Sequence, residues 1–327
     1  MIKKTIYAAF CATGLLAGIT AAAAQTGEAP ARTECLAGGK PGSGFDLSCR
    51  LLSETLLKTG LISSRMSVNY MEGGAGATVF NHVIGVRSAE PGLVVPASLG
   101  TALLLSQKKF GRYDETNVRW IGAIASDYGA VAVAPESPIK NLSDLMAALK
   151  QDPASVVIGG AGTIGSQDWM KAALIAREAG VDPKKLRFVT QNGGAAAATS
   201  VAGGHIDVYF GDAAELGPNV QAGLVKVISV LADERLPGTL ADVPTAEEEG
   251  VDVTWPIWRG FYAGPKITDA EYQWWVEALR KLVETPEFAA ERDRRGLFQL
   301  VAIGPAFDEL LKKNIENFKT LAKEAGL

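Results

Sequence analysis

The chain repeats one local pattern, in which a short apolar run leads into a glycine-rich turn and then into a run of helical period. The first turn, Lys40–Asp46, precedes the helical pattern Leu47–Leu57. A second apolar run, Met66–Tyr70, leads into the turn Glu72–Thr78, which opens another helical pattern. Strands that alternate with helices favour a parallel or mixed sheet covered on both faces. The sequence therefore predicts an α/β fold.

The same pattern returns in the second half of the chain. The apolar run Val156–Gly159 leads into the turn Gly160–Asp168, and Leu186–Thr190 leads into Gln191–Gly194; a helical pattern follows each turn. With 327 residues, of which 47% are hydrophobic, the chain is long enough for two cores. The repetition thus predicts two α/β domains.

Two crossings of the chain are expected to connect these domains. The alternation of strands and helices restarts near 127–134, and a proline-rich bend leads back near 254–261. We therefore predict a domain II of residues 128–259, inserted into a domain I of residues 25–127 and 260–327. Each domain would be a mixed sheet flanked by helices. The boundary between them would form a hinged cleft, a common place for ligands.

Residues 1–24 have the features of a secretory signal peptide. Lys3 and Lys4 precede an uncharged run that ends at Thr20, and Ala22–Ala24 fit the small-residue cleavage rule. No later apolar run reaches the roughly 20 residues of a membrane span. We therefore expect an exported, soluble protein that begins at Gln25. Loss of two lysines would change the net charge from −4 to −6, which leaves no basic patch for nucleic acid.

Backbone amides in the glycine-rich turns are candidate donors to an anion. In the first turn, Gly42 and Gly44 let the backbone approach a ligand closely, while Ser43 or Asp46 can cap the following helix. A row of N–H groups at a helix N-terminus binds carboxylate or phosphate without a basic side chain. One such turn alone also fits an ordinary connection from strand to helix. The repetition favours a binding site.

The third turn has a dinucleotide-binding pattern that is incomplete. Gly160, Gly162 and Gly165 match G-x-G-x-x-G between a strand and a helix. The acidic residue expected about 20 residues later is absent, because residues 190–192 are Thr, Gln and Asn. Nicotinamide chemistry is therefore not favoured, although the anion-binding part of the motif remains.

Motifs for other catalytic chemistry are weak. Neither the G-x-S-x-G motif nor the P-loop motif occurs, and His82 and His205 have no paired nucleophile. No cluster of His, Cys, Asp and Glu has metal-ligand spacing. Ser126 with Asp127, and Asp207 with Asp212, could suggest acid–base work, but acids at strand ends commonly cap helices or satisfy loop amides. The sequence predicts no enzymatic activity, no cofactor and no metal.

Two cysteines, Cys35 and Cys49, flank the first turn. In an exported chain such a pair is expected to be oxidised. A disulfide would tie the first strand to the helix that carries the turn. Two reduced, buried thiols are the alternative.

Six segments of the chain together carry a family resemblance: Glu34–Cys35, Lys40–Asp46, Tyr70–Gly76, Gly162–Trp169, Gly203–His205 and Arg259–Tyr262. They resemble the solute-binding receptors of tripartite tricarboxylate transporters, the Bug receptor family, and the citrate-type receptors in particular. The likeness spans roughly residues 33–327. The Pro-Gly-Gly-x-x-Asp turn of the family is matched at Pro41, Gly42 and Asp46, whereas Ser43 replaces the second glycine.

This resemblance implies a type II periplasmic binding protein fold, whose two domains close on a carboxylate. The turns at 41–46 and 73–76 would anchor one end of the ligand, and those at 163–167 and 193–194 would contact the other. The implied ligand-binding residues are Pro41, Gly42, Ser43, Gly44, Phe45, Asp46, Gly73, Gly74, Ala75, Gly76, Ser98, Tyr128, Thr163, Gly165, Ser166, Gln167, Gly193, Gly194, Asp212 and Arg259.

Arg259 is the candidate partner for a further carboxylate of the ligand. It lies beside Gly260 in the second crossing, between Trp258 and Phe261. A guanidinium group pairs bidentately with carboxylate, which would suit a tricarboxylate. The alternative is an ion pair that braces the hinge.

The function implied by the resemblance is that of a monomeric periplasmic receptor. It would capture a citrate-like tricarboxylate and deliver it to a large and a small membrane subunit for uptake. A periplasmic carboxylate sensor that presents its ligand to a signalling kinase is the alternative, and an exported enzyme is the third reading.

Overall fold

The computed structural model describes residues 28–191 and 193–325. The predicted signal peptide, residues 1–24, lies outside the described residues. The strands are β1 (Glu34–Ala37), β2 (Ser67–Tyr70), β3 (Leu93–Ser98), β4 (Arg119–Val133), β5 (Val157–Ala161), β6 (Arg187–Gln191), β7 (Val208–Asp212), β8 (Lys226–Leu231), β9 (Pro256–Ala263) and β10 (Phe298–Ile303).

Helices follow most of these strands, as the sequence predicts. The α-helices are α1 (Gly44–Lys58), α2 (Ala77–Gly85), α3 (Leu99–Ser106), α4 (Leu142–Gln151), α5 (Gln167–Glu178), α6 (Gly194–Ala202), α7 (Ala213–Gln221), α8 (Asp269–Val283), α9 (Pro286–Arg294) and α10 (Pro305–Ala325). Short 3-10 helices are η1 (Gly74–Gly76), η2 (Glu115–Asn117), η3 (Pro183–Lys185) and η4 (Gly238–Leu240).

One mixed sheet runs through the molecule in the order β2-β1-β3-β9-β4-β7-β5-β6, and β10 and β8 both pair with β4. The strand β4 connects its two parts. Residues 119–128 of β4 pair with β9, whereas residues 129–133 pair with β7 and β8. The sequence predicts two separate extended runs here, Val118–Ile124 and Ala130–Val133. The structure corrects this to one strand, because ion pairs satisfy the buried Asp127 between the two runs.

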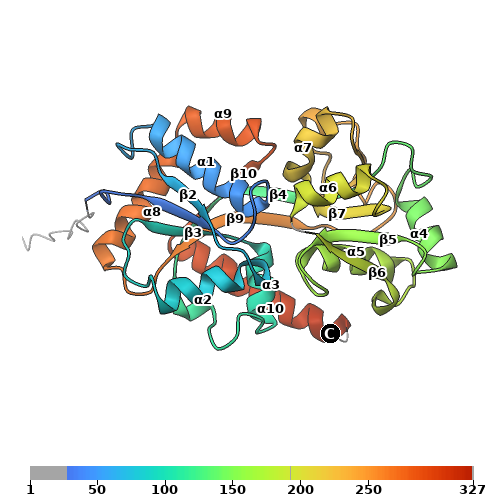
Figure 1. The fold of residues 1–327 in the computed structure, drawn as a ribbon, viewed down its shortest axis with the longest axis horizontal. Helices are drawn as coiled ribbons and strands as arrows, with labels where there is room; N and C mark the ends of the chain where they lie inside the picture. The colour runs from blue at the N-terminus through green and yellow to red at the C-terminus, as the bar shows by residue number, and fades with distance from the viewer. Residues whose placement is uncertain (1–27, 192, 326–327) are drawn as a thin grey trace, which may run out of the picture.

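The helices form two groups, which Figure 1 shows on either side of the long strands β4 and β9. Helices α1, α2, α8 and α9 surround β1, β2 and β3, while α4, α5, α6 and α7 surround β5, β6 and β7. This is the two-domain arrangement of a type II periplasmic binding protein, with a mixed sheet in each domain. The limits 25–127 with 260–327 and 128–259 remain a prediction.

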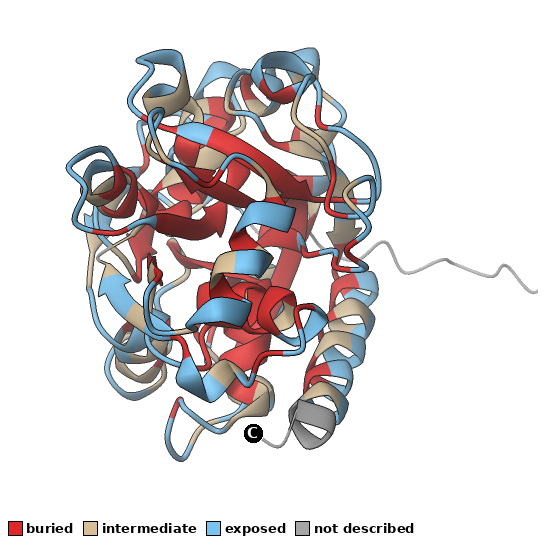
Figure 2. Ribbon diagram, turned by 90° about the vertical axis from the view of Figure 1, so that its right-hand side faces the viewer, coloured by how far each residue is buried: buried red, intermediate tan, exposed pale blue. Residues whose placement is uncertain are grey.

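The central strands are buried and the helices expose one face, as Figure 2 shows. All six residues of β3 are buried, and so are seven of the eight in β9. Such continuous burial is typical of strands covered on both faces. Helix α3 is missing from the sequence-based prediction. Five of its eight residues are apolar, and six are buried, so it lacks the polar face that marks an amphipathic helix.

The N-terminus of α1 is fixed by local hydrogen bonds and by a disulfide. Ser43 is the cap: its Oγ accepts the N–H of Asp46 at 3.4 Å. Cys35 of β1 and Cys49 of α1 form a disulfide across a sequence separation of 14 residues. The predicted pairing is thereby confirmed, and the first turn is held between two covalently linked elements.

Replacement of both cysteines, Cys35→Ser with Cys49→Ser, should destabilise the folded protein by about 3 kcal/mol, since the unfolded chain loses a loop constraint of roughly 15 residues. Chemical denaturation of the variant and the parent measures this difference. Intact mass before and after reduction provides the control, because a disulfide gains two hydrogens. Two alkylatable thiols in native, unreduced protein would contradict the pairing.

Candidate functional site

Glycine-rich loops from the two halves of the chain face each other at the centre of the molecule. A Cβ atom added to Gly42 would lie 3.2 Å from the Cβ of Ala195, and one added to Gly193 would lie 3.4 Å from the Cβ of Ser43. The loops after β1 and β6 therefore meet directly. Similarly, a Cβ atom on Gly162 would lie 3.9 Å from that of Ala75, which brings together the loops after β2 and β5.

Hydrogen bonds also cross between these halves. Gln107, which caps the C-terminus of α3, donates from Nε2 to the carbonyl oxygen of Gly165 at 3.0 Å. Lys109 donates from Nζ to the carbonyl oxygen of Ile164 at 2.9 Å. The two domains are thus in contact across the cleft, and the loop that follows β5 is held from the opposite side.

The loop 41–46 is stabilised by the carboxylate of Asp46, the last residue of the loop. The carboxylate of Asp46 accepts the N–H of Gly42 at 2.8 Å, the Nε of Arg50 at 2.9 Å and the hydroxyl of Tyr70 at 2.7 Å. Gly42 has a φ of 82°, a conformation that favours glycine. In this structure Asp46 therefore supports the shape of the loop.

The loop 73–76 packs beside it. Gly73, Gly74, Ala75 and Gly76 all have positive φ, from 51° to 132°. A Cβ atom on Gly76 would lie 3.5 Å from the ring of Phe45. Three of these four positions need glycine because the backbone there is left-handed. The sequence-based placement of this loop beside the first one agrees with these contacts.

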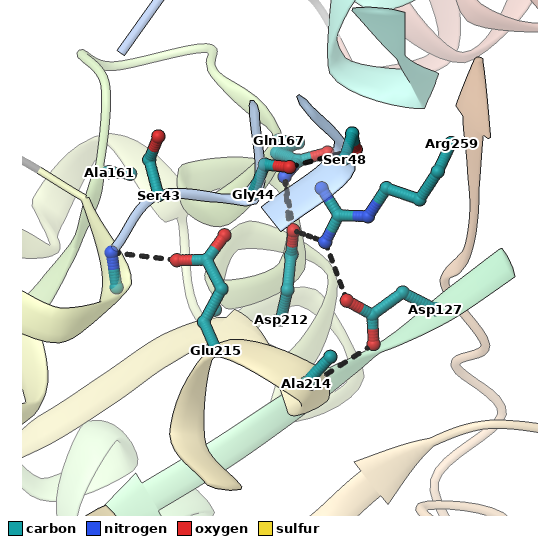
Figure 3. Close-up of polar contacts among 12 residues, drawn as sticks. Ser43, Gly44, Ser48, Asp127, Ala161, Gln167, Asp212, Ala214, Glu215 and Arg259 are labelled. Atoms are coloured by element: carbon teal, nitrogen blue, oxygen red, sulfur yellow. Dashed lines mark hydrogen bonds and ion pairs between the residues drawn. The ribbon is translucent and has the colours of Figure 1, made fainter. Parts of the chain in front are cut away.

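A set of buried charges lies close to the loops, and Figure 3 shows three of its members, Asp127, Asp212 and Arg259. Nη2 of Arg259 lies 2.5 Å from Oδ2 of Asp127 and 2.8 Å from Oδ2 of Asp212. Nζ of Lys171 lies 2.6 Å from Oδ1 of Asp212 and 2.8 Å from Oδ1 of Asp168. We call these five residues the ion cluster; it joins β4, β7, β9 and α5.

Burial and pairing shift the pKa values of the ion cluster in different directions. Burial raises the pKa of Asp168 to about 6, although Lys171 opposes it. Burial also raises the pKa of Asp127, against the effect of Arg259. Burial would also raise the pKa of Asp212, but the positive charges of Lys171 and Arg259 outweigh burial and lower this pKa. Asp212 is thus the firmly ionised centre of the cluster.

The remaining predicted site residues take varied places. Ser98 pairs in register with Arg259 and caps α3, and Gln167 donates from Nε2 to both oxygens of Asp212 at 3.2 Å. Ser166 donates its hydroxyl to the carbonyl oxygen of Ala161. The ring of Tyr128 packs edge-on against Phe298, 5.3 Å between centroids, while its backbone N–H donates to Oδ1 of Asp127 at 2.8 Å.

Lys171 and Glu215 were missed in the sequence, and the place of Asp127 in a buried cluster of charges was not predicted. Lys171 follows Asp168 by three positions on one helix, a spacing that could have indicated their pairing. Asp127 carries a local signal only as a polar residue in an apolar run. Glu215, whose Oε2 accepts the N–H of Gly194 at 2.7 Å, lies 21 residues further along the chain and has no such signal.

Comparison with known proteins places the chain in a family. Residues 74–327 match the model of the tripartite tricarboxylate transporter family receptor. The chain therefore belongs to this family of solute-binding receptors, which are not enzymes.

Individual relatives agree with this assignment. A UPF0065 protein from the TAR-I ttuE-ttuC' intergenic region of Agrobacterium vitis is 26% identical over 87% of this chain and 82% of its own length. Among solved structures, MatC from Rhodopseudomonas palustris with bound malate has a TM-score of 0.78 at 19% identity, over 89% of this chain and 99% of its own. A second R. palustris protein, with adipate, has a TM-score of 0.78 at 18% identity, over 90% and 97%.

Two further observations concern the described residues alone. In residues 28–191 and 193–325, no helix combines the length and the apolar character that a membrane crossing needs. Within that same part of the chain, no group of three or more His, Cys, Asp and Glu side chains is placed to hold a metal ion.

Removal of the central cation, Arg259→Ala, should lower the free energy of unfolding of the ligand-free protein by about 3–5 kcal/mol. The substitution leaves Asp127 and Asp212 buried with too little positive charge. Urea denaturation measures the loss. Arg177→Ala, at an exposed position of α5, is the matched control and should change little. An unchanged stability together with lost ligand binding would show instead that Arg259 serves the ligand.

Proposed function

We propose that the chain is a periplasmic receptor that captures a small di- or tricarboxylate and delivers it to the membrane subunits of a tripartite tricarboxylate transporter. The observation that carries this proposal is the meeting of four glycine-rich loops from both domains. Their backbone N–H groups, two sets of which lie at the N-termini of α1 and α6, suit carboxylate groups.

Polar side chains beside Gly44 and Gly100 support the same proposal. Oε1 of Gln167 and Nε of Arg259 are buried and find no hydrogen-bond partner among the described residues. Buried polar atoms are normally paired, so such atoms next to a cleft favour a polar ligand. Micromolar capture needs about −8 kcal/mol, which several charge-assisted hydrogen bonds of about 1.5–3 kcal/mol each can supply.

Whether the site suits a dicarboxylate or a tricarboxylate depends on whether Arg259 can bind a carboxyl group of the ligand. The sequence-based proposal of a citrate-like tricarboxylate assigns it to a third carboxylate. In the structure its Nη2 is engaged by Asp127 and Asp212, and a Cβ atom added to Gly44 would lie 2.1 Å from its Nη1. Nη1 is thus the guanidinium nitrogen that lies beside Gly44 at the start of α1. Malate and adipate, the ligands of two structural relatives, have two carboxyl groups.

A ligand screen tests the proposal. Malate, adipate and citrate are added separately to the purified mature protein, and the melting temperature is measured. At about 100 times Kd a bound ligand should add about 2.7 kcal/mol to the free energy of unfolding. A larger effect of citrate would support the tricarboxylate version. No stabilisation by any of the three would reject the proposed function for this class of ligand.

The loop backbone is tested by Gly44→Ala. A Cβ atom at this position would lie 2.1 Å from Nη1 of Arg259 and 2.7 Å from Oε1 of Glu215. We therefore expect the loops not to close in their present arrangement, with carboxylate affinity reduced by a factor of about ten or more, on the order of 1.4 kcal/mol. Calorimetry measures the change. Gly85→Ala, where a Cβ atom meets nothing within 4 Å, should bind as the parent does.

A further inference from the structure

The carboxyl group of Glu215 lies where the two sets of loops meet. Glu215 is the third residue of α7, and its Oε2 accepts the N–H of Gly194, the first residue of α6. On the other side, its Oε1 would lie 2.7 Å from a Cβ atom added to Gly44, the first residue of α1. The carboxyl group of Glu215 therefore lies between the N-termini of α1 and α6 (Figure 3).

The charges around Glu215 are unbalanced. The ion cluster has three aspartates and two cations, all with at most 3% of their surface exposed. An ionised Glu215 would make four negative charges against two, and an anionic ligand would add more. The titratable and charged groups packed around Glu215 come from four elements: Asp127 of β4, Asp168 and Lys171 of α5, Tyr209 and Asp212 of β7, and Arg259 of β9.

We propose that Glu215 determines which ligands the site accepts: its carboxyl group, when protonated, donates a hydrogen bond to a carboxylate of the ligand, so that capture of the anion is linked to one proton on Glu215. This inference rests on the proposed carboxylate-binding function. The proton comes from solvent and no covalent bond to carbon changes.

The geometry gives the two oxygens of Glu215 different tasks. Oε2 accepts the N–H of Gly194, which it does in either charge state. Oε1 faces the loop of α1, and there only the protonated form can donate, since a carboxylate is purely an acceptor. Burial, with Asp212 next in effect, raises the pKa of Glu215 to about 8. Because the residue is half-buried, its proton can exchange with solvent.

A ligand-free measurement tests the protonation itself. The usual pKa of a glutamate is 4.5, which also holds in the unfolded chain, and the folded value is about 8. Between these values the folded protein holds a proton that the unfolded chain has lost, so stability falls as the pH rises through this window. Glu215→Gln should lose the part of this slope between pH 6 and pH 8, which lies above the pKa of about 6 of Asp168. Glu178→Gln, at an exposed position of α5, should keep it.

A binding measurement tests the link to the ligand. Calorimetry with malate, adipate and citrate between pH 7 and pH 10 should show an affinity that falls about tenfold per pH unit above pH 8 in the parent and in Glu178→Gln. In Glu215→Gln the amide supplies an N–H donor without a charge to lose. Its affinity should be nearly independent of pH and should exceed that of the parent at pH 9.5.

The outcomes separate this inference from the proposed function. Binding of a carboxylate with the same pH dependence in the parent and in Glu215→Gln would overturn the inference and leave the function standing; Glu215 would then be only a fixed tie between α7 and α6. Affinity that rises above pH 8 would also overturn it, because binding of the carboxylate would then not require the proton on Glu215. Failure of all three ligands to bind at any pH, with the stability slope intact, would overturn both.

Discussion

The contact between Arg259 and its two aspartates is the interaction on which the arrangement of the cleft depends. It joins β9 to β4 and β7 at the place where β4 passes from one domain to the other. Asp212 also forms an ion pair with Lys171, which in turn pairs with Asp168. Oδ2 of Asp168 accepts the N–H of Ala161 at the end of β5. Buried charges need partners, so this series fixes the loop after β5 relative to the hinge.

Above this ion cluster the site is made largely of backbone. The loops use left-handed conformations and approach each other so closely that a methyl group at Gly44 or Gly194 would overlap with Arg259 or Glu215. Amides of this kind suit any carboxylate. In our proposal, selection among carboxylates depends on Glu215, whose carboxyl group lies beside Gly194 and Gly44 at the N-termini of α6 and α1.

Sequence reasoning worked where the signal was local. Of the two candidate caps of the first helix, Ser43 is the one found in the structure, and capping acts within a few residues. The sequence-based prediction was wrong where buried residues lack the usual alternation of polar and apolar positions or where a distant residue supplies the partner. Helix α3 has no polar face, and β4 continues through Asp127 because Arg259, 132 residues away, supplies the missing charge.

The sequence by itself determined the α/β class, the glycine-rich turns, the disulfide partners and the likeness to the receptor family, because each depends on residue types at short, regular spacing. Only the tertiary structure decided which charges pair and which groups meet between the glycine-rich loops. Gly44, Gly194 and Glu215 meet through the packing of three helices on one sheet, and Arg259 meets Asp127 and Asp212 through strand register. Such meetings depend on how distant segments pack, and no periodicity along the chain encodes them.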